Sequence, residues 1–193
     1  MDTQIFIGRA EEQATLQALY LNKEADLVAV LGRRRVGKTF LIKQTFNMKF
    51  DFYFTGIKNS DKEATLAAFV AKIQEYAKLA YPLEVPDNWF SAFELLKKYL
   101  SSKKLKQKKV IFLDELPWMD THLSNFLPAL EYFWNHWAVD QNIIIVICGS
   151  ATSWMIDNIR NNSGGLHNRV SKYLYIEPFT LADRKSTRLN PVT

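Results

Sequence analysis

The stretch Gly32-Arg33-Arg34-Arg35-Val36-Gly37-Lys38-Thr39 decides the fold of this chain. It matches the pattern G-x-x-x-x-G-K-[ST], in which the glycines let the backbone fold into a tight loop whose N–H groups point at phosphate oxygens. In that pattern the lysine reaches the β- and γ-phosphates and the threonine hydroxyl ligates Mg²⁺. The alternative is a glycine-rich turn with a solvated basic cluster, and the flanking residues weigh against it.

The residues on both sides of this loop have the order that a phosphate-binding loop, or P-loop, requires: strand, loop, helix. Leu27-Val28-Ala29-Val30-Leu31 is an apolar run typical of a buried strand, and Phe40, Leu41 and Gln44 continue with helical spacing. A helix that starts there adds the positive end of its dipole to the same anion site. We therefore assign nucleotide binding to residues 32–39 and to the adjoining Phe40.

The rest of the chain alternates helical and strand-like segments. Strands are predicted at 26–32, 51–56, 109–114, 142–149 and 173–177, and helices at 9–22, 38–48, 61–80, 89–101, about 124–138 and about 152–160. Short apolar strands separated by helices favour a parallel sheet covered on both faces, and right-handed crossovers make it a doubly wound, three-layer α/β sandwich. One helix carries an aromatic stripe that predicts a core face: Phe126, Leu127, Leu130, Phe133, Trp134 and Trp137.

The composition is that of a soluble globular domain. The chain has 193 residues, an apolar fraction of 48%, a formal net charge of +5 and one cysteine, Cys148, inside an apolar run. There is no disulfide framework and no metal-ligand spacing, and the three histidines are scattered. No signal peptide or membrane span is apparent, so we expect one cytoplasmic domain without a membrane partner.

Part of the basic excess is a run of lysines between residues 97 and 109. A solvated helix end and linker is the favoured interpretation, and a nucleic-acid patch is the alternative. The lysines concerned are Lys97, Lys98, Lys103, Lys104, Lys106, Lys108 and Lys109.

Two carboxylates follow four apolar residues in Val110-Ile111-Phe112-Leu113-Asp114-Glu115, which is the Walker B form. Asp114 stands at the carboxyl end of a buried strand, where α/β sheets bind ligands, and opposite Thr39 it would orient the Mg²⁺ shell. Glu115 would orient the attacking water or take its proton. Acidic residues also end strands at a solvated edge, but the P-loop earlier in the chain favours the catalytic interpretation.

Three further polar residues are candidates for the same site. Ser150 follows the fourth predicted strand, where it would contact the γ-phosphate or the attacking water; capping the helix at 152–160 is the alternative, and both can hold. Arg169 precedes the fifth strand and is a candidate arginine finger toward the γ-phosphate of its own chain or of a neighbour, with a surface arginine as the alternative. Arg160 is a second, less favoured candidate.

These motifs together resemble the archaeal-type ATPase family, a branch of the signal-transduction ATPases with numerous domains that is related to AAA+ proteins. The resemblance extends from about residue 4 to 181 and includes Leu113-Asp114-Glu115-Leu116-Pro117-Trp118, Ile147-Cys148-Gly149-Ser150 and the opening Phe6-Ile7-Gly8-Arg9. It implies ATP rather than GTP, five strands in the order 5-1-4-3-2, and an adenine contact from Ile7, Gly8 and Arg9. Ala10 departs from the pattern, because the family usually has glutamate there.

The end of the chain also departs from the family pattern. Family members continue after the fifth strand into a helical lid, whereas residues 184–191 have no helical or strand period. We expect a P-loop ATPase core over 1–182 and an irregular, non-native tail over 183–193. The chain is then a truncated nucleotide-binding core.

The leading hypothesis is an ATP-binding core with Mg²⁺-dependent hydrolysis of the β–γ bond. A nucleotide-gated switch or DNA-binding regulatory module with negligible turnover is the alternative, and DNA, a protein or a second copy of the chain are its candidate partners. The acidic pair argues against a small-molecule kinase, and the lack of an Asn-Lys-x-Asp motif argues against a GTPase. The candidate catalytic residues are Glu115, Lys38, Ser150 and Arg169, and the candidate metal ligands are Thr39 and Asp114.

Overall fold

The computed structural model describes residues 9–103, 107–161 and 165–179. Its strands are β1 (Asp26–Leu31), β2 (Phe52–Thr55), β3 (Lys109–Asp114), β4 (Ile143–Cys148) and β5 (Lys172–Tyr175). Its helices are α1 (Ala10–Leu21), α2 (Lys38–Thr45), α3 (Lys62–Ala77), α4 (Trp89–Ser102), α5 (Phe126–His136) and α6 (Thr152–Met155). Short helical turns lie at Leu116–Trp118, Ala138–Asp140, Ile156–Arg160 and His167–Arg169.

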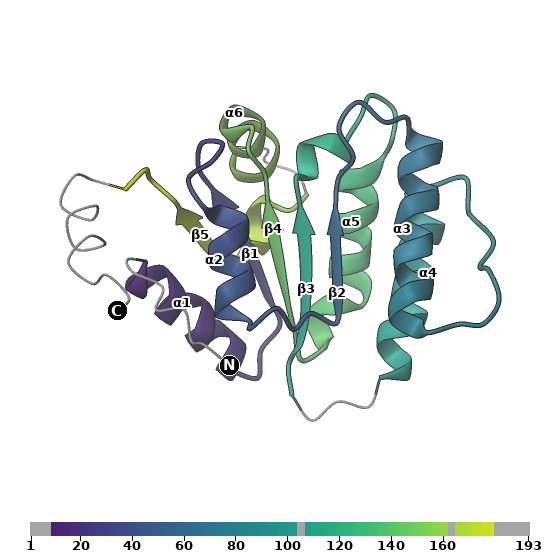
Figure 1. Ribbon diagram of the computed structural model, residues 1–193, viewed down its shortest axis with the longest axis horizontal. Coiled ribbons are helices and arrows are strands. Elements are labelled where there is room, and N and C mark those ends of the chain that lie inside the picture. The colour runs from purple at the N-terminus through teal and green to yellow at the C-terminus, as the bar shows by residue number, and fades with distance from the viewer. Residues whose placement is uncertain (1–8, 104–106, 162–164, 180–193) are drawn as a thin grey trace, which may run out of the picture.

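The five strands form one parallel sheet in the order β2-β3-β4-β1-β5 (Figure 1). This is the predicted order 5-1-4-3-2 counted from the other edge, so the doubly wound α/β expectation is confirmed. The register pairs Val30 with Cys148 and Leu113 with Ile147. As a result β1, β3 and β4 end side by side, and the residues that follow them meet at one edge of the sheet.

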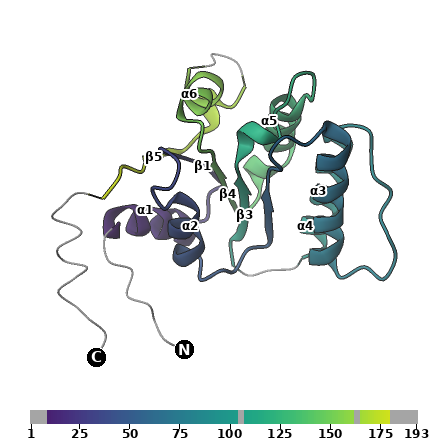
Figure 2. The ribbon, with the colours of Figure 1, turned by 45° about the horizontal axis from the view of Figure 1, so that its top comes forward.

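Helices cover both faces of the sheet, and the alternation of side chains along each strand explains why. In β4, Ile143, Ile145 and Ile147 pack with α3, α4 and α5, whereas Ile144 and Val146 pack with α1 and α2. Figures 1 and 2 show the two groups of helices on opposite sides of the sheet. Because both faces are buried, β1 and β4 are apolar without alternation, as the sequence shows.

The predicted elements are present, but several are shorter than the sequence suggests. The helix expected at 38–48 ends at Thr45, because Asn47 and Met48 have φ of 51° and 58°, which a right-handed helix does not allow. The helix expected at 152–160 is one α-turn followed by a wider π-turn, and the strand expected at 173–177 spans Lys172–Tyr175. The helix expected near 124–138 begins at Phe126, so Pro128 lies in its first turn, where proline is tolerated.

The interpretation of the lysine run as solvated is wrong for Lys108. Its ammonium is buried and donates to Asp26 Oδ2 at 2.7 Å, to Asn22 Oδ1 at 2.7 Å and to the Leu19 carbonyl at 2.6 Å. These contacts join the end of α1 to the starts of β1 and β3. Such a pair is strongly destabilising when one partner is removed, because the other charge is left buried alone.

Other lysines of this run also have acidic partners, which weakens the nucleic-acid alternative for them. Lys103 donates to Asp51 at 2.9 Å, and Lys97 donates to Glu94 at 3.2 Å. Lys98 is exposed, as expected, whereas Lys104 and Lys106 lie outside the described residues.

Some other expectations also concern residues that the structure does not describe. The adenine-side residues Ile7 and Gly8, and the tail over 183–193, lie outside the described residues, as does the domain boundary at 182. Across the described part of the chain, no helix combines the length and apolar character needed to cross a bilayer.

Candidate nucleotide-binding site

The P-loop connects β1 to α2 and bends through three residues with positive φ: Gly32 at 150°, Arg35 at 67° and Gly37 at 91°. At Gly32 the bend is also forced by packing, because a Cβ there would collide with the carbonyl oxygen of Ile176 in the segment after β5. The amide of Ile176 in turn donates to the Leu31 carbonyl at 2.7 Å. The end of β5 therefore supports the loop from one side.

The Lys38 side chain lies within this loop. The residue is 6% exposed, and its ammonium donates to the carbonyls of Gly32 at 2.6 Å and Arg33 at 2.9 Å. A buried cation is stable only when its protons are accepted, and here two carbonyls of the loop accept them. These bonds place a positive charge at the mouth of the loop, beside the first turn of α2.

The P-loop is joined to β3 by a hydrogen bond between the two predicted metal ligands. Thr39 Oγ1 donates to Asp114 Oδ2 at 2.9 Å. Because the hydroxyl is the donor in this hydrogen bond, the lone pairs of its oxygen stay free for a cation. The arrangement offers hard oxygen donors of the kind that Mg²⁺ prefers.

The Asp114 carboxyl is 4% exposed, and burial raises its pKa above the ordinary value. The nearby Glu115 charge adds to this rise, whereas hydrogen bonds from Thr39, Cys148 and the Glu115 amide oppose it. A divalent cation would relieve the cost of burying this charge. The described residues contain no group of three or more His, Cys, Asp or Glu that could hold a metal ion by itself, but a phosphate-bound Mg²⁺ needs only one or two protein oxygens.

Glu115 is held in an unusual turn directly after β3. Its φ is 53°, and a Cβ at Gly56 would lie 2.5 Å from the Glu115 carbonyl oxygen, so the tip of β2 needs a glycine to fit against this turn. The Glu115 carboxylate accepts from the Ser150 hydroxyl at 2.8 Å and from the Ser150 amide at 3.2 Å. Two predicted catalytic residues from β3 and β4 therefore meet.

Ser150 does not cap α6, which was its alternative role. The cap position of α6 is Ala151, without a side-chain hydrogen bond, and the Ser150 hydroxyl is engaged by Glu115 instead. Gly149 before it is buried, and a Cβ there would lie 2.9 Å from Met155 Sδ and from Pro117 Cδ. The glycine thus lets β4 end close against the turn after β3.

The arginines predicted to bind nucleotide lie in two different environments. Arg33, Arg34 and Arg35 are exposed on the loop. Arg9 joins the start of α1 to the segment after β5: its guanidinium contacts Glu12, the Glu177 carbonyl and the face of Phe179. These contacts place Arg9 beside the segment that follows β5, the strand that pairs with β1.

Arg169 and Arg160 are the candidates for an arginine finger. Arg169 is exposed and precedes β5, whereas the P-loop follows the far end of β1, which pairs in parallel with β5. The structure therefore does not bring Arg169 next to the P-loop of its own chain. Arg160 lies nearer the carboxyl ends of the strands, because it donates to the hydroxyl of Tyr175, the last residue of β5, at 2.8 Å.

Sequence reasoning missed Cys148 and Gly56 as parts of the site. Burial, with the negative charge of Asp114 beside it, raises the pKa of the Cys148 thiol well above its ordinary value. Only the strand register places Cys148 level with Asp114, and only the turn after β3 requires Gly56. The sequence signal for both was their position at a strand end beside a predicted motif.

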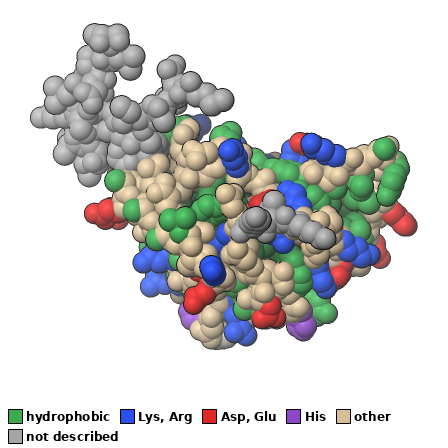
Figure 3. All heavy atoms as spheres, turned by 90° about the horizontal axis from the view of Figure 1, so that it is seen from below, with side chains coloured by type: hydrophobic (Ala, Val, Ile, Leu, Met, Phe, Trp, Pro, Cys, Tyr) green, Lys and Arg blue, Asp and Glu red, His purple; other side chains and the backbone are tan. Residues whose placement is uncertain are grey.

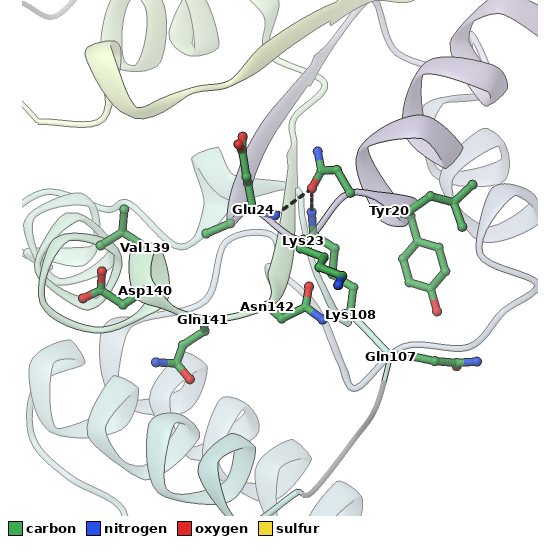
Figure 4. A pocket seen from close by; sticks show the side chains of 12 residues that line it. Tyr20, Lys23, Glu24, Gln107, Lys108, Val139, Asp140, Gln141 and Asn142 are labelled. Carbon is green, nitrogen blue, oxygen red and sulfur yellow. Dashed lines mark hydrogen bonds between the residues drawn. The ribbon is translucent and has the colours of Figure 1, made fainter.

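A hollow of about 870 Å³ lies away from this site, at the opposite edge of the sheet. Figure 4 shows Lys108 and Asn142 among its lining side chains, with Val139 and Asp140 on another side. Figure 3 views the molecule from that edge, where charged side chains of both signs are scattered. No predicted site residue lines the hollow.

Comparisons with known proteins show the family of this chain. A family model described as an ATPase domain predominantly from Archaea matches residues 6–187. The chain belongs to this family. The archaeal-type ATPase domain is also 23% identical over 177 residues to an uncharacterized protein of Methanocaldococcus jannaschii, covering 90% of this chain and 36% of the relative.

Solved structures share the fold of this ATPase domain. A Walker-type ATPase of Pyrococcus abyssi aligns with a TM-score of 0.58 and 18% identity, over 95% of this chain and 58% of that one. The Aeropyrum pernix ORC2 protein, in ADPNP and ADP complexes, aligns with a TM-score of 0.63 and 18% identity, over 94% and 50%. A signal-transduction ATPase with numerous domains from Pyrococcus horikoshii aligns with a TM-score of 0.53 and 15% identity, over 96% and 25%.

The chain thus spans 36% of the curated relative and 58% or less of these three structures.

Proposed function

We propose that this ATPase domain binds Mg·ATP at the P-loop and hydrolyses its β–γ bond. The hydrogen bond from Thr39 to Asp114 is the observation that carries the proposal, because it links the loop to the Walker B strand with the hydroxyl lone pairs free. Thr39 and Asp114 would hold the Mg²⁺ shell. The ion, when bound, would neutralise charge that develops on the phosphate oxygens.

The protein's own contribution is positioning and charge stabilisation. The loop amides and Lys38 would grip the phosphates, and the start of α2 would add its dipole. Glu115 would accept a hydrogen bond from the attacking water and orient it, while the Ser150 hydroxyl would donate to the γ-phosphate. Arg9 would stand on the adenine side, together with Ile7 and Gly8.

The direct test measures binding of labelled ATP and GTP to the purified chain, with and without Mg²⁺, followed by single-turnover hydrolysis. Tight ATP binding that requires Lys38, with turnover that requires Glu115, is the expected result. ATP binding that is indifferent to Lys38→Ala would remove the P-loop from the function, and turnover that is indifferent to Glu115→Gln would remove the assigned role of Glu115.

A nucleotide-gated switch is the second candidate, and the contact between Glu115 and Ser150 favours it. In this arrangement both donors of Ser150 occupy the carboxylate that would orient water. Hydrolysis then requires a rearrangement, which a partner would supply. Single-turnover hydrolysis with and without duplex DNA separates the candidates, because a gated domain would hydrolyse ATP only in the presence of its partner.

A second copy of the chain is a further candidate partner. Exposed Arg169 lies away from the P-loop of its own chain, so it would serve as an arginine finger only across such an interface. Sedimentation with and without Mg·ATP would test this assembly, and an unchanged monomer would exclude it.

A further inference from the structure

We propose that Cys148 is a positioning residue for the metal site: its S–H group donates to the Asp114 carboxylate and keeps that carboxylate aimed at Thr39. The inference rests on the proposed function, because it assigns a role within the same Mg·ATP site. It gives the only cysteine of the chain a task that packing does not require.

The strand register carries the inference. Leu113 of β3 pairs with Ile147 of β4, so the next residues, Asp114 and Cys148, stand level on neighbouring strands. Cys148 belongs to the apolar cluster on the α2 side of the sheet, and so does Phe112, which precedes Asp114 by two residues. Because alternate residues of a strand share a face, both side chains point toward α2 from neighbouring positions, and the thiol is close enough to the Asp114 carboxylate for its negative charge to raise the thiol pKa.

Each oxygen of the Asp114 carboxylate accepts a hydrogen bond from a different donor. Thr39 donates to Oδ2 and the Glu115 amide donates to Oδ1 at 3.0 Å. Both of these groups lie in segments that would contact nucleotide or water. Cys148 is the last residue of a central strand and is 0% exposed, so its donor stays fixed.

Packing alone would be satisfied by an apolar residue. The cross-strand partner of Cys148 on its other side is Val30, and the preceding same-face residue of β4 is Val146. A valine at position 148 would continue this surface. A neutral thiol adds a weak donor without adding charge, which suits a position beside both Lys38 and Asp114.

Two pairs of variants of matched shape test the role. Cys148→Ser and Cys148→Ala differ by a hydroxyl donor at small volume, and Cys148→Thr and Cys148→Val differ by the same donor at larger volume. For each chain, binding of a fluorescent ATP analogue is titrated with Mg²⁺, starting from an EDTA baseline. Thermal unfolding of each variant shows whether its fold is kept.

We expect the two variants that lack a donor to need about fivefold more Mg²⁺ for half-saturation, which is the effect of losing one modest hydrogen bond. The serine and threonine variants should stay within about twofold of the natural chain, and Mg²⁺-free binding should be equal in all five. If the valine variant does not fold, the serine and alanine pair still decides.

Two results would overturn the inference. Either the Mg²⁺ requirement follows side-chain size rather than the hydroxyl, or all the variants match the natural chain. A natural chain that binds the analogue without any dependence on Mg²⁺ would instead refute the proposed function itself, and the inference with it.

Discussion

The hydroxyl of Ser150 donates to Glu115 Oε2 at 2.8 Å, and the amide of the same serine donates to the same oxygen at 3.2 Å. The contact joins the ends of β4 and β3 directly beside the P-loop. Both residues are proposed to act at the γ-phosphate, and substitution of each can separate their roles.

Replacement of Ser150 by alanine should leave ATP affinity within about twofold and reduce turnover about 100-fold, the effect of removing one donor to a developing negative charge. Binding is spared because the loop and Lys38 remain. Filter binding and single-turnover hydrolysis measure the two quantities. Equal or faster turnover would mean that the serine only restrains Glu115.

Glu115→Gln should retain Mg·ATP binding and lose turnover by at least about 100-fold, because the amide keeps the side-chain shape but is a poor acceptor for the proton of water. Rapid mixing with labelled ATP gives the rate. Glu94→Gln is the matched control, since Glu94 pairs with half-buried Lys97 in the middle of α4. The control should hydrolyse ATP at the natural rate.

Lys38→Ala should weaken both ATP binding and turnover. The substitution removes a charge held by two loop carbonyls, and those carbonyls would then face the phosphates unpartnered. We expect a loss of about 100-fold in ATP affinity, which corresponds to about 2.7 kcal/mol. Lys43→Ala, in the last turn of the same helix, is the control and should bind ATP as before.

Asp114→Asn should stabilise the nucleotide-free protein at neutral pH, and it should raise the Mg²⁺ concentration that ATP binding needs. Burial raises the pKa of Asp114 in the folded state, so its stabilising contribution is complete below the unfolded pKa and is lost as the pH rises through the folded pKa. The neutral amide avoids that loss. A gain on the order of 1 kcal/mol would raise Tm by about 2–4 °C.

Thermal melts at pH 4 and pH 7 check this relation. The difference in Tm between Asp114→Asn and the natural chain should be larger at pH 7. A difference that is larger at pH 4 would show that the buried carboxylate is a net stabiliser when charged.

Lys108→Met should destabilise the fold by about 3–5 kcal/mol, because Asp26 would keep a buried charge without its partner. The same change at exposed Lys98 should alter stability by less than about 0.5 kcal/mol. Denaturant unfolding measures both. Similar midpoints for the two variants would contradict the structural role of the Lys108 network.

The sequence predicted the order of elements because that information is local. Glycine and lysine spacing specified the P-loop, and continuous apolar runs specified buried strands such as β1 and β4. Boundaries were less well predicted: α2 ends at Thr45, since the left-handed turn at Asn47 and Met48 has no strong sequence signal.

The prediction of the strand order had a different basis. It followed from the resemblance to a known family, because pairing between strands distant in the chain leaves no mark on either segment alone. The same applies to Lys108, which no local pattern distinguishes from its solvated neighbours, although it forms a buried pair with Asp26.

The amino-acid sequence by itself determined that a phosphate-binding loop lies between a buried strand and a helix, and that two carboxylates end another buried strand. Only the tertiary structure decided which side chains meet: Thr39 with Asp114, Ser150 with Glu115, and Cys148 level with Asp114. The physical reason is that motif chemistry depends on neighbours along the chain, whereas these contacts depend on the register of parallel strands whose residues are far apart in sequence.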